Sequence, residues 1–76
     1  MELTEFRQLF EKAATERGLS ISVREKGDRK NPVIAIMSRG STVVAYLSDA
    51  GTRDLNELVN ERLGALERKL ALGGAA

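Results

Sequence analysis

The chain contains no cysteine, no histidine and no tryptophan among its 76 residues. Without cysteine the fold has neither a disulfide framework nor a thiolate metal site, a composition that fits a reducing compartment. Histidine is the commonest general base and cysteine the strongest nucleophile, so the residue types used most often in catalysis are missing. We therefore expect a protein that is not an enzyme, with no catalytic residue, no metal site and no cofactor.

Long apolar runs are missing as well. No segment approaches the ~20 apolar residues that a membrane-spanning helix needs. The first residues include Glu2 and Glu5 and lack the basic start of a signal peptide. The formal net charge of +1 argues against strong nonspecific attraction to nucleic acid or to an anionic membrane. We expect a cytoplasmic protein without membrane contact.

Aromatic residues are scarce, so the core must be built mainly from leucine, isoleucine, valine and alanine. The composition, 42% hydrophobic and 30% charged, is typical of a folded domain. A chain of this length forms one domain with a small core and a modest margin of stability. We predict a single domain over residues 1–72 and a flexible C-terminal tail over residues 73–76.

Two segments repeat apolar residues at steps of three and four and are predicted to be helices, over residues 2–17 and 53–71. Gly18 is predicted to end the first helix, and Thr52 or Asp54 to cap the second. Gly64, inside the second helix, costs about 1 kcal/mol relative to alanine. We interpret it as a tolerated defect, the alternative being a close approach of another backbone. The last turns, which carry Leu66, Leu70 and Leu72, are expected to overhang the sheet.

Three further segments are predicted to be strands, over residues 19–25, 33–39 and 42–48. The first alternates apolar and polar residues, with Leu19, Ile21 and Val23 on the buried side. The second and third are joined by a tight turn, of type I′ at Arg39-Gly40 or type II′ at Gly40-Ser41. The simplest compact arrangement is an α+β fold of order α-β-β-β-α, a three-stranded antiparallel meander with two helices packed on one face.

The second and third strands are apolar on both sides, which is the most informative feature of the sequence. One side receives Ile34, Ile36, Val43, Ala45 and Leu47. If both helices cover that side, the other side has no internal cover and is a candidate protein interface. The alternatives are that a helix or the tail wraps over the second side, or that the helices cover opposite sides. The candidate protein-binding residues are Val33, Ala35, Met37, Arg39, Val44 and Tyr46.

A basic cluster between the first two strands is the candidate nucleic-acid contact, consisting of Arg24, Lys26, Arg29 and Lys30. Glu25 and Asp28 lie within the same stretch, and no stacking aromatic residues accompany it. These features favour a solvated loop, so nucleic acid ranks below a protein partner.

The order of elements resembles that of the double-stranded-RNA-binding domain and of the small HicA-type toxin that shares its fold. RNA-binding domains of this kind place a lysine cluster at the start of the second helix, where this chain reads Thr52-Arg53-Asp54-Leu55. The toxins need a histidine on the sheet, and this chain has none. The resemblance is therefore one of fold outline and does not assign a function.

We expect a small nonenzymatic module that binds another protein, or a second copy of itself as a homodimer, through the apolar sheet face. Small proteins of this kind often act as adaptors or inhibitors. Phage-encoded inhibitors of host defence are one such class, suggested here by size and lack of catalytic chemistry. The alternative is an RNA- or DNA-associated module that uses the basic loop, and a nuclease-like toxin with an atypical site is a weaker third option.

Overall fold

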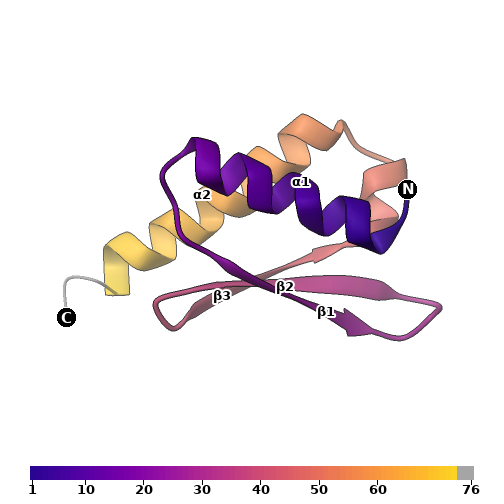
Figure 1. The fold of residues 1–76 in the computed structure, drawn as a ribbon, viewed down its shortest axis with the longest axis horizontal. Coiled ribbons are helices and arrows are strands. Elements are labelled where there is room, and N and C mark those ends of the chain that lie inside the picture. Colours follow the sequence, from indigo (N-terminus) through magenta and orange to yellow (C-terminus); the bar gives the residue numbers. More distant parts are fainter. Residues whose placement is uncertain (74–76) are drawn as a thin grey trace.

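The computed structural model of the chain describes residues 1–73. The strands form one antiparallel sheet in the order β1-β2-β3. Both helices lie on the same side of this sheet (Figure 1). The predicted α-β-β-β-α meander is therefore confirmed. The elements are α1 (Leu3–Glu16), β1 (Ser22–Gly27), β2 (Pro32–Ser38), β3 (Ser41–Tyr46), the 3-10 helix η1 (Leu47–Gly51) and α2 (Leu55–Gly73).

The expected C-terminal tail over residues 73–76 falls almost wholly outside the described part of the chain. Gly73 is the last residue of α2, and residues 74–76 lie beyond the described residues.

The end of α1 fixes where the sheet begins. Gly18 has a φ of 70°, and the N–H of Leu19 donates a hydrogen bond to the carbonyl of Ala14 at 2.8 Å. This pattern is the Schellman motif, with Gly18 ending the helix as the sequence predicts. Because the motif turns Leu19 back toward α1, β1 starts at Ser22 and not at residue 19 as predicted.

The β2–β3 connection is a two-residue turn. Ser38 pairs with Ser41, and the two residues between them, Arg39 and Gly40, have φ values of 50° and 86°. Positive φ at both central residues defines the type I′ turn, whose twist matches that of the flanking strands. Of the two predicted turns, the Arg39-Gly40 alternative is the one that forms.

The third strand is shorter than predicted, because Leu47 and Ser48 belong to η1. Leu47 still packs against the core from this position. The second helix also begins later than predicted, at Leu55, since the carboxylate of Asp54 accepts a hydrogen bond from the N–H of Glu57 at 3.1 Å. Asp54 is thus the N-cap.

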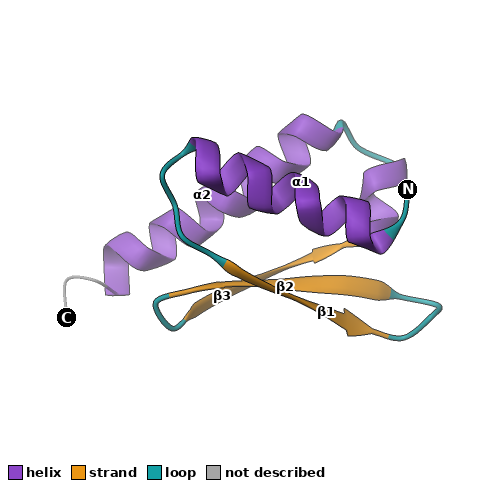
Figure 2. Cartoon of the chain, in the orientation of Figure 1, coloured by secondary structure: helices purple, strands orange, loops and turns teal. Residues whose placement is uncertain are grey.

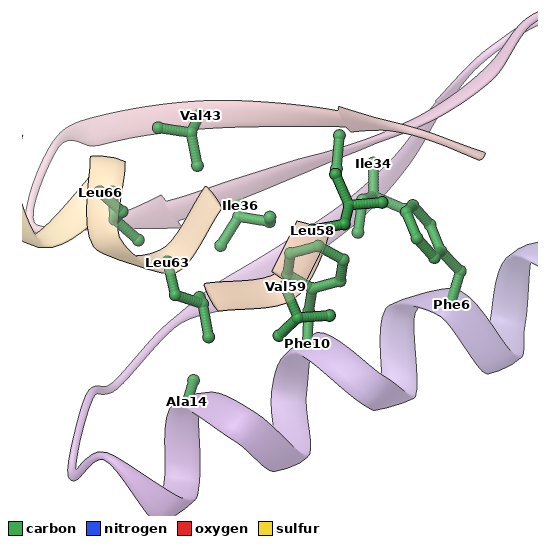
Figure 3. Packing of buried hydrophobic residues seen from close by; sticks show 11 residues of the cluster. Phe6, Phe10, Ala14, Ile34, Ile36, Val43, Leu58, Val59, Leu63 and Leu66 are labelled. Carbon is green, nitrogen blue, oxygen red and sulfur yellow. The ribbon is translucent and has the colours of Figure 1, made fainter. Parts of the chain in front are cut away.

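The core lies between the two helices and the inner side of the sheet (Figure 3). Phe6 and Phe10 pack edge to face with ring centroids 5.1 Å apart. Ile34 and Ile36 of the central strand are fully buried against them. The core cluster consists of Phe6, Phe10, Ala14, Ile34, Ile36, Val43, Ala45, Leu58, Val59, Leu63 and Leu66.

The predicted overhang of α2 is confined to its last residues. Leu66 is fully buried and Leu70 packs against the core, whereas Leu72 is 81% exposed. The side chain of Arg17 holds α2 against the end of α1, with its Nη1 atom 2.6 Å from Oε1 of Glu67. Within residues 1–73, no helix combines the length and the apolar character needed to cross a membrane.

Candidate protein-binding face

The side of the sheet that faces away from both helices is the candidate site. Antiparallel partners point to the same side of a sheet, so the register assigns every strand residue to one side or the other. Three cross-strand rows lie opposite the buried Ile34 and Ile36. We call their nine residues the outer face: Ser22, Met37 and Thr42; Arg24, Ala35 and Val44; and Lys26, Val33 and Tyr46.

No element among residues 1–73 covers the outer face, as the cartoon shows (Figure 2). Val44 and Tyr46 are 39% and 43% exposed, which is high for large apolar side chains in a sheet. Val33 and Met37 are half-buried. The described residues therefore contradict a helix that wraps over this side and helices on opposite sides. The alternative that the tail covers this side concerns residues 74–76, which lie outside the described residues.

Ala35 occupies the centre of the outer face but is only 1% exposed. It is not part of the core cluster on the helix side. Its short side chain lies between Val33 and Met37 along β2 and between Arg24 and Val44 across the sheet. Ala35 thus offers little surface, and a bound partner would contact the larger side chains around it.

Arg39 lies beside the outer face and not on it. It is exposed in the type I′ turn at one end of the β2–β3 hairpin. The other five predicted protein-binding residues share the outer face with polar neighbours that include Ser22 and Thr42.

The charges of β1 are sorted between the two sides of the sheet. Arg24 and Lys26 lie on the outer face, whereas Glu25 pairs across the sheet with the buried Ile34. The carboxylate of Glu25 meets the guanidinium of Arg7 on α1, with Oε2 and Nη1 3.0 Å apart. The outer face therefore has two cations and no carboxylate among its nine residues.

The β1–β2 loop has a defined shape. The carboxylate of Asp28 accepts hydrogen bonds from the N–H groups of Lys30 and Asn31, both at 2.9 Å. Gly27 has a φ of 84°, and a Cβ built there would lie 2.3 Å from the carbonyl oxygen of Asn31. Only glycine fits this position.

The loop presents Arg29 and Lys30 to solvent at the same end of the sheet as Lys26. None of the four predicted nucleic-acid residues forms an ion pair within residues 1–73. In the sequence, Glu25 and Asp28 lie within this cluster and weaken the prediction that it contacts nucleic acid. The carboxylate of Glu25 points to the helix side and pairs with Arg7, so the outer face is more basic than the sequence suggests. The carboxylate of Asp28 accepts backbone N–H groups but keeps its negative charge beside Arg29 and Lys30.

The acidic side chains of the described residues are the remaining polar groups to place. No three acidic side chains within it come together in a way that could hold a metal ion. The carboxylate of Glu61 accepts a hydrogen bond from Arg53, which lowers the pKa of Glu61 below its ordinary value. Arg53 precedes α2 and Glu61 lies within that helix, so this exposed pair is not on the outer face.

The fold and the outer face are the features from which the function of this chain is inferred, because comparison with known proteins gives no match. No model of a known protein family matches the chain, and no curated protein or solved structure is significantly similar to it.

Proposed function

We propose that the protein is a nonenzymatic binding module whose outer face docks a protein partner with an apolar centre and an acidic flank. The observation that carries the proposal is the composition of this face. Exposed Val44 and Tyr46 lie on β3 at one side, and the cations of β1 lie at the other side without a neighbouring carboxylate.

The apolar part of the outer face has the composition of an interface centre. Tyrosine, methionine and arginine are enriched at protein interfaces, and buried aromatic side chains often carry most of the binding energy. Tyr46 is the exposed aromatic residue here, with Val33 beside it on β2. We expect Tyr46 to be the main anchor.

The basic part sets the expected charge of the partner. Complementary charges at an interface speed association and exclude wrong partners. Arg24 and Lys26 project from the outer face, and Arg29 and Lys30 extend the positive charge into the loop. A partner surface that carries aspartate or glutamate next to apolar residues complements this arrangement. A protein that functions by binding a partner through this face would act as an inhibitor or an adaptor.

Selection of peptides from a random displayed library tests this proposal with a defined probe. We expect selected peptides to combine acidic and apolar residues and to lose affinity for the Tyr46→Glu variant. Lys12→Glu, a change at an exposed position of α1, is the matched control and should bind normally. Peptides without acidic residues, or equal loss in both variants, would contradict the proposal.

Nucleic acid is a second candidate partner, favoured by one observation. Of the two carboxylates that the sequence places within the basic cluster, Glu25 lies on the helix side of the sheet and pairs with Arg7. Capture of partners from a lysate with and without nuclease separates the candidates. Retention after nuclease treatment supports the protein partner, and loss on nuclease treatment supports RNA or DNA.

A further inference from the structure

The two edges of the sheet differ in charge. The strand order β1-β2-β3 leaves one side of β1 and one side of β3 without a neighbouring strand. β1 carries three charged residues in a row, Arg24, Glu25 and Lys26. Charges on an edge strand are a common protection against pairing with another chain. β3 reads Ser-Thr-Val-Val-Ala-Tyr and carries no charged residue of its own. Lys69 of α2 places its ammonium group near one end of this edge, at the carbonyl of Thr42.

Alternate residues of β3 direct their backbone groups to the open edge. In a hairpin closed by a two-residue turn, Ser38 and Ser41 form the hydrogen-bonded pair next to the turn. Hydrogen-bonded and non-bonded pairs alternate along an antiparallel ladder. The backbone groups of Thr42, Val44 and Tyr46 therefore point away from β2. The Nζ atom of Lys69 donates to the Thr42 carbonyl at 2.6 Å, which places that carbonyl on the open edge.

We propose that a second copy of the chain pairs with this edge, β3 against β3, in an antiparallel ladder with its twofold axis at Val44. Twofold contacts are the commonest way in which identical chains associate. In this register Val44 faces Val44 of the second copy, and Thr42 faces the second copy's Tyr46. β3 contributes no charged side chain to the contact. The Thr42 carbonyl already accepts a hydrogen bond from Lys69, and its second lone pair is the acceptor for the N–H of Tyr46 in the second copy.

The sequence of β3 favours a second copy over a foreign strand. The strand is similar in character when read in either direction from Val44, with valine and alanine on the helix side and threonine and tyrosine on the outer side. Pairing of the two β3 edges also removes from each copy the edge whose own strand carries no charged residue. Only the charged β1 edges then remain, so association stops at the dimer.

The dimer has a consequence for the outer face. Pairing at β3 creates a six-stranded sheet with the helices of both copies on the same side. The two outer faces become one surface, with Val44 and Tyr46 of both copies at its centre and Arg24 and Lys26 near each far edge. This inference stands on the strand edge alone and does not depend on the proposed partner.

Sedimentation velocity and isotope-filtered NMR test the dimer. We expect a monomer–dimer equilibrium between micromolar and millimolar concentrations of the full chain. In a mixture of carbon-13-labelled and unlabelled copies, we expect an NOE between the Hα of Val43 and the Hα of Ala45 in the other copy. These residues form a non-hydrogen-bonded pair in the proposed register, and such pairs have the closest backbones.

Two variants separate edge pairing from face-to-face association. Val44→Pro removes an N–H that points to the open edge, a position where a strand tolerates proline, and should give a folded monomer. Met37→Glu changes the outer face on the central strand and should leave the dimer intact. If the proline variant does not fold, N-methylvaline at position 44 in a synthetic chain removes the same N–H.

Two results would overturn the proposal. One is a wild-type chain that stays monomeric at millimolar concentration, which would leave the edge to a foreign strand. The other is a dimer that lacks the NOE between copies, survives loss of the Val44 N–H and dissociates in Met37→Glu. That pattern would show association through the outer face.

Discussion

The guanidinium of Arg7 on α1 lies 3.0 Å from the carboxylate of Glu25 on β1. The two side chains are 34% and 38% exposed, so the ion pair contributes little to stability. Its importance lies in the distribution of charge. Strand alternation places Glu25 on the helix side, where Arg7 pairs with it, so Arg24 and Lys26 lie on the outer face without a carboxylate among its residues.

Neutralising neighbouring charges of β1 should have different effects on binding. Glu25→Gln should change the free energy of unfolding by less than about 1 kcal/mol and leave the affinity for a selected acidic peptide unchanged. Arg24→Gln should have a similarly small effect on the free energy of unfolding, but it should weaken peptide binding and reduce the salt dependence of that binding. Urea unfolding and calorimetric titration at two salt concentrations measure both quantities. Equal effects of the two changes on affinity would contradict the assignment of the outer face.

The two sides of the sheet should respond differently to substitution. Ile36 is fully buried, and Ile36→Ala should lower the free energy of unfolding by about 2–5 kcal/mol, enough to unfold much of a small domain. Val44 is 39% exposed, and Val44→Thr should change the free energy of unfolding by no more than about 0.5 kcal/mol. Thermal unfolding measures both. Equal losses of stability would mean that the outer face is buried within one chain.

Replacing Gly64 and Gly27 with alanine should have opposite effects on the free energy of unfolding. A Cβ at Gly64 would meet only Nη1 of Arg68, at 3.7 Å, so Gly64→Ala should stabilise α2 by about 0.5–1 kcal/mol. Gly27→Ala should destabilise the β1–β2 loop by about 1–3 kcal/mol, given its φ of 84° and the clash with Asn31. Denaturant unfolding measures both. A destabilised Gly64→Ala protein would support the alternative that another backbone approaches α2 there.

Binding to duplex RNA or DNA should be weak and should disappear by physiological salt. If the four cations of the outer face and loop each neutralise one phosphate, log K should fall with log salt concentration with a slope of about −4 or shallower. Fluorescence anisotropy over a salt series measures the slope. A submicromolar Kd at physiological salt that Arg29→Glu plus Lys30→Glu abolishes would make nucleic acid the leading partner.

The carboxyl group of Glu61 should have a pKa below the ordinary value of a glutamate. The hydrogen bond from Arg53, assisted by its charge, lowers the pKa of Glu61. A pKa that is lower in the folded state stabilises the fold above the unfolded pKa, and the stabilisation is lost as pH falls through the folded pKa. A carbon-13 NMR titration should show the low midpoint, and Arg53→Gln should raise it. An unchanged midpoint in that variant would show that Arg53 is not the cause.

The sequence was sufficient to predict the element order, the hairpin and the side of the sheet that each residue of β2 and β3 faces. These features depend on local periodicity and turn chemistry, as at Arg39 and Gly40. The strand ends were less predictable, because they depend on neighbouring structure. Leu19 alternates with Ile21 and Val23, yet its N–H is held by α1, and Leu47 continues the apolar pattern of β3 but begins η1.

The charge of the candidate site was the part that sequence reasoning missed. Alternation along β1 places Glu25 on the same side as Val23, so parity alone could have removed it from the outer face. Its partner Arg7 lies on α1, and nothing local in the sequence joins them. The hydrogen bonds that Asp28 accepts from loop N–H groups likewise require the three-dimensional loop, and they leave its negative charge in place. The burial of Ala35 follows from its small size among larger neighbours.

Chemical-shift mapping of a bound peptide tests the central claim most directly. Nitrogen-15-labelled protein is titrated with an acidic peptide taken from the library selection. Shift changes concentrated on the outer face and the β1–β2 loop, strongest around Tyr46 and Arg24, are the result that we predict. The alternative surface is the groove between α1 and α2, which is lined by Leu9, Ala13, Leu55 and Val59. Shift changes confined to that groove would contradict the claim that the outer sheet face is the functional surface.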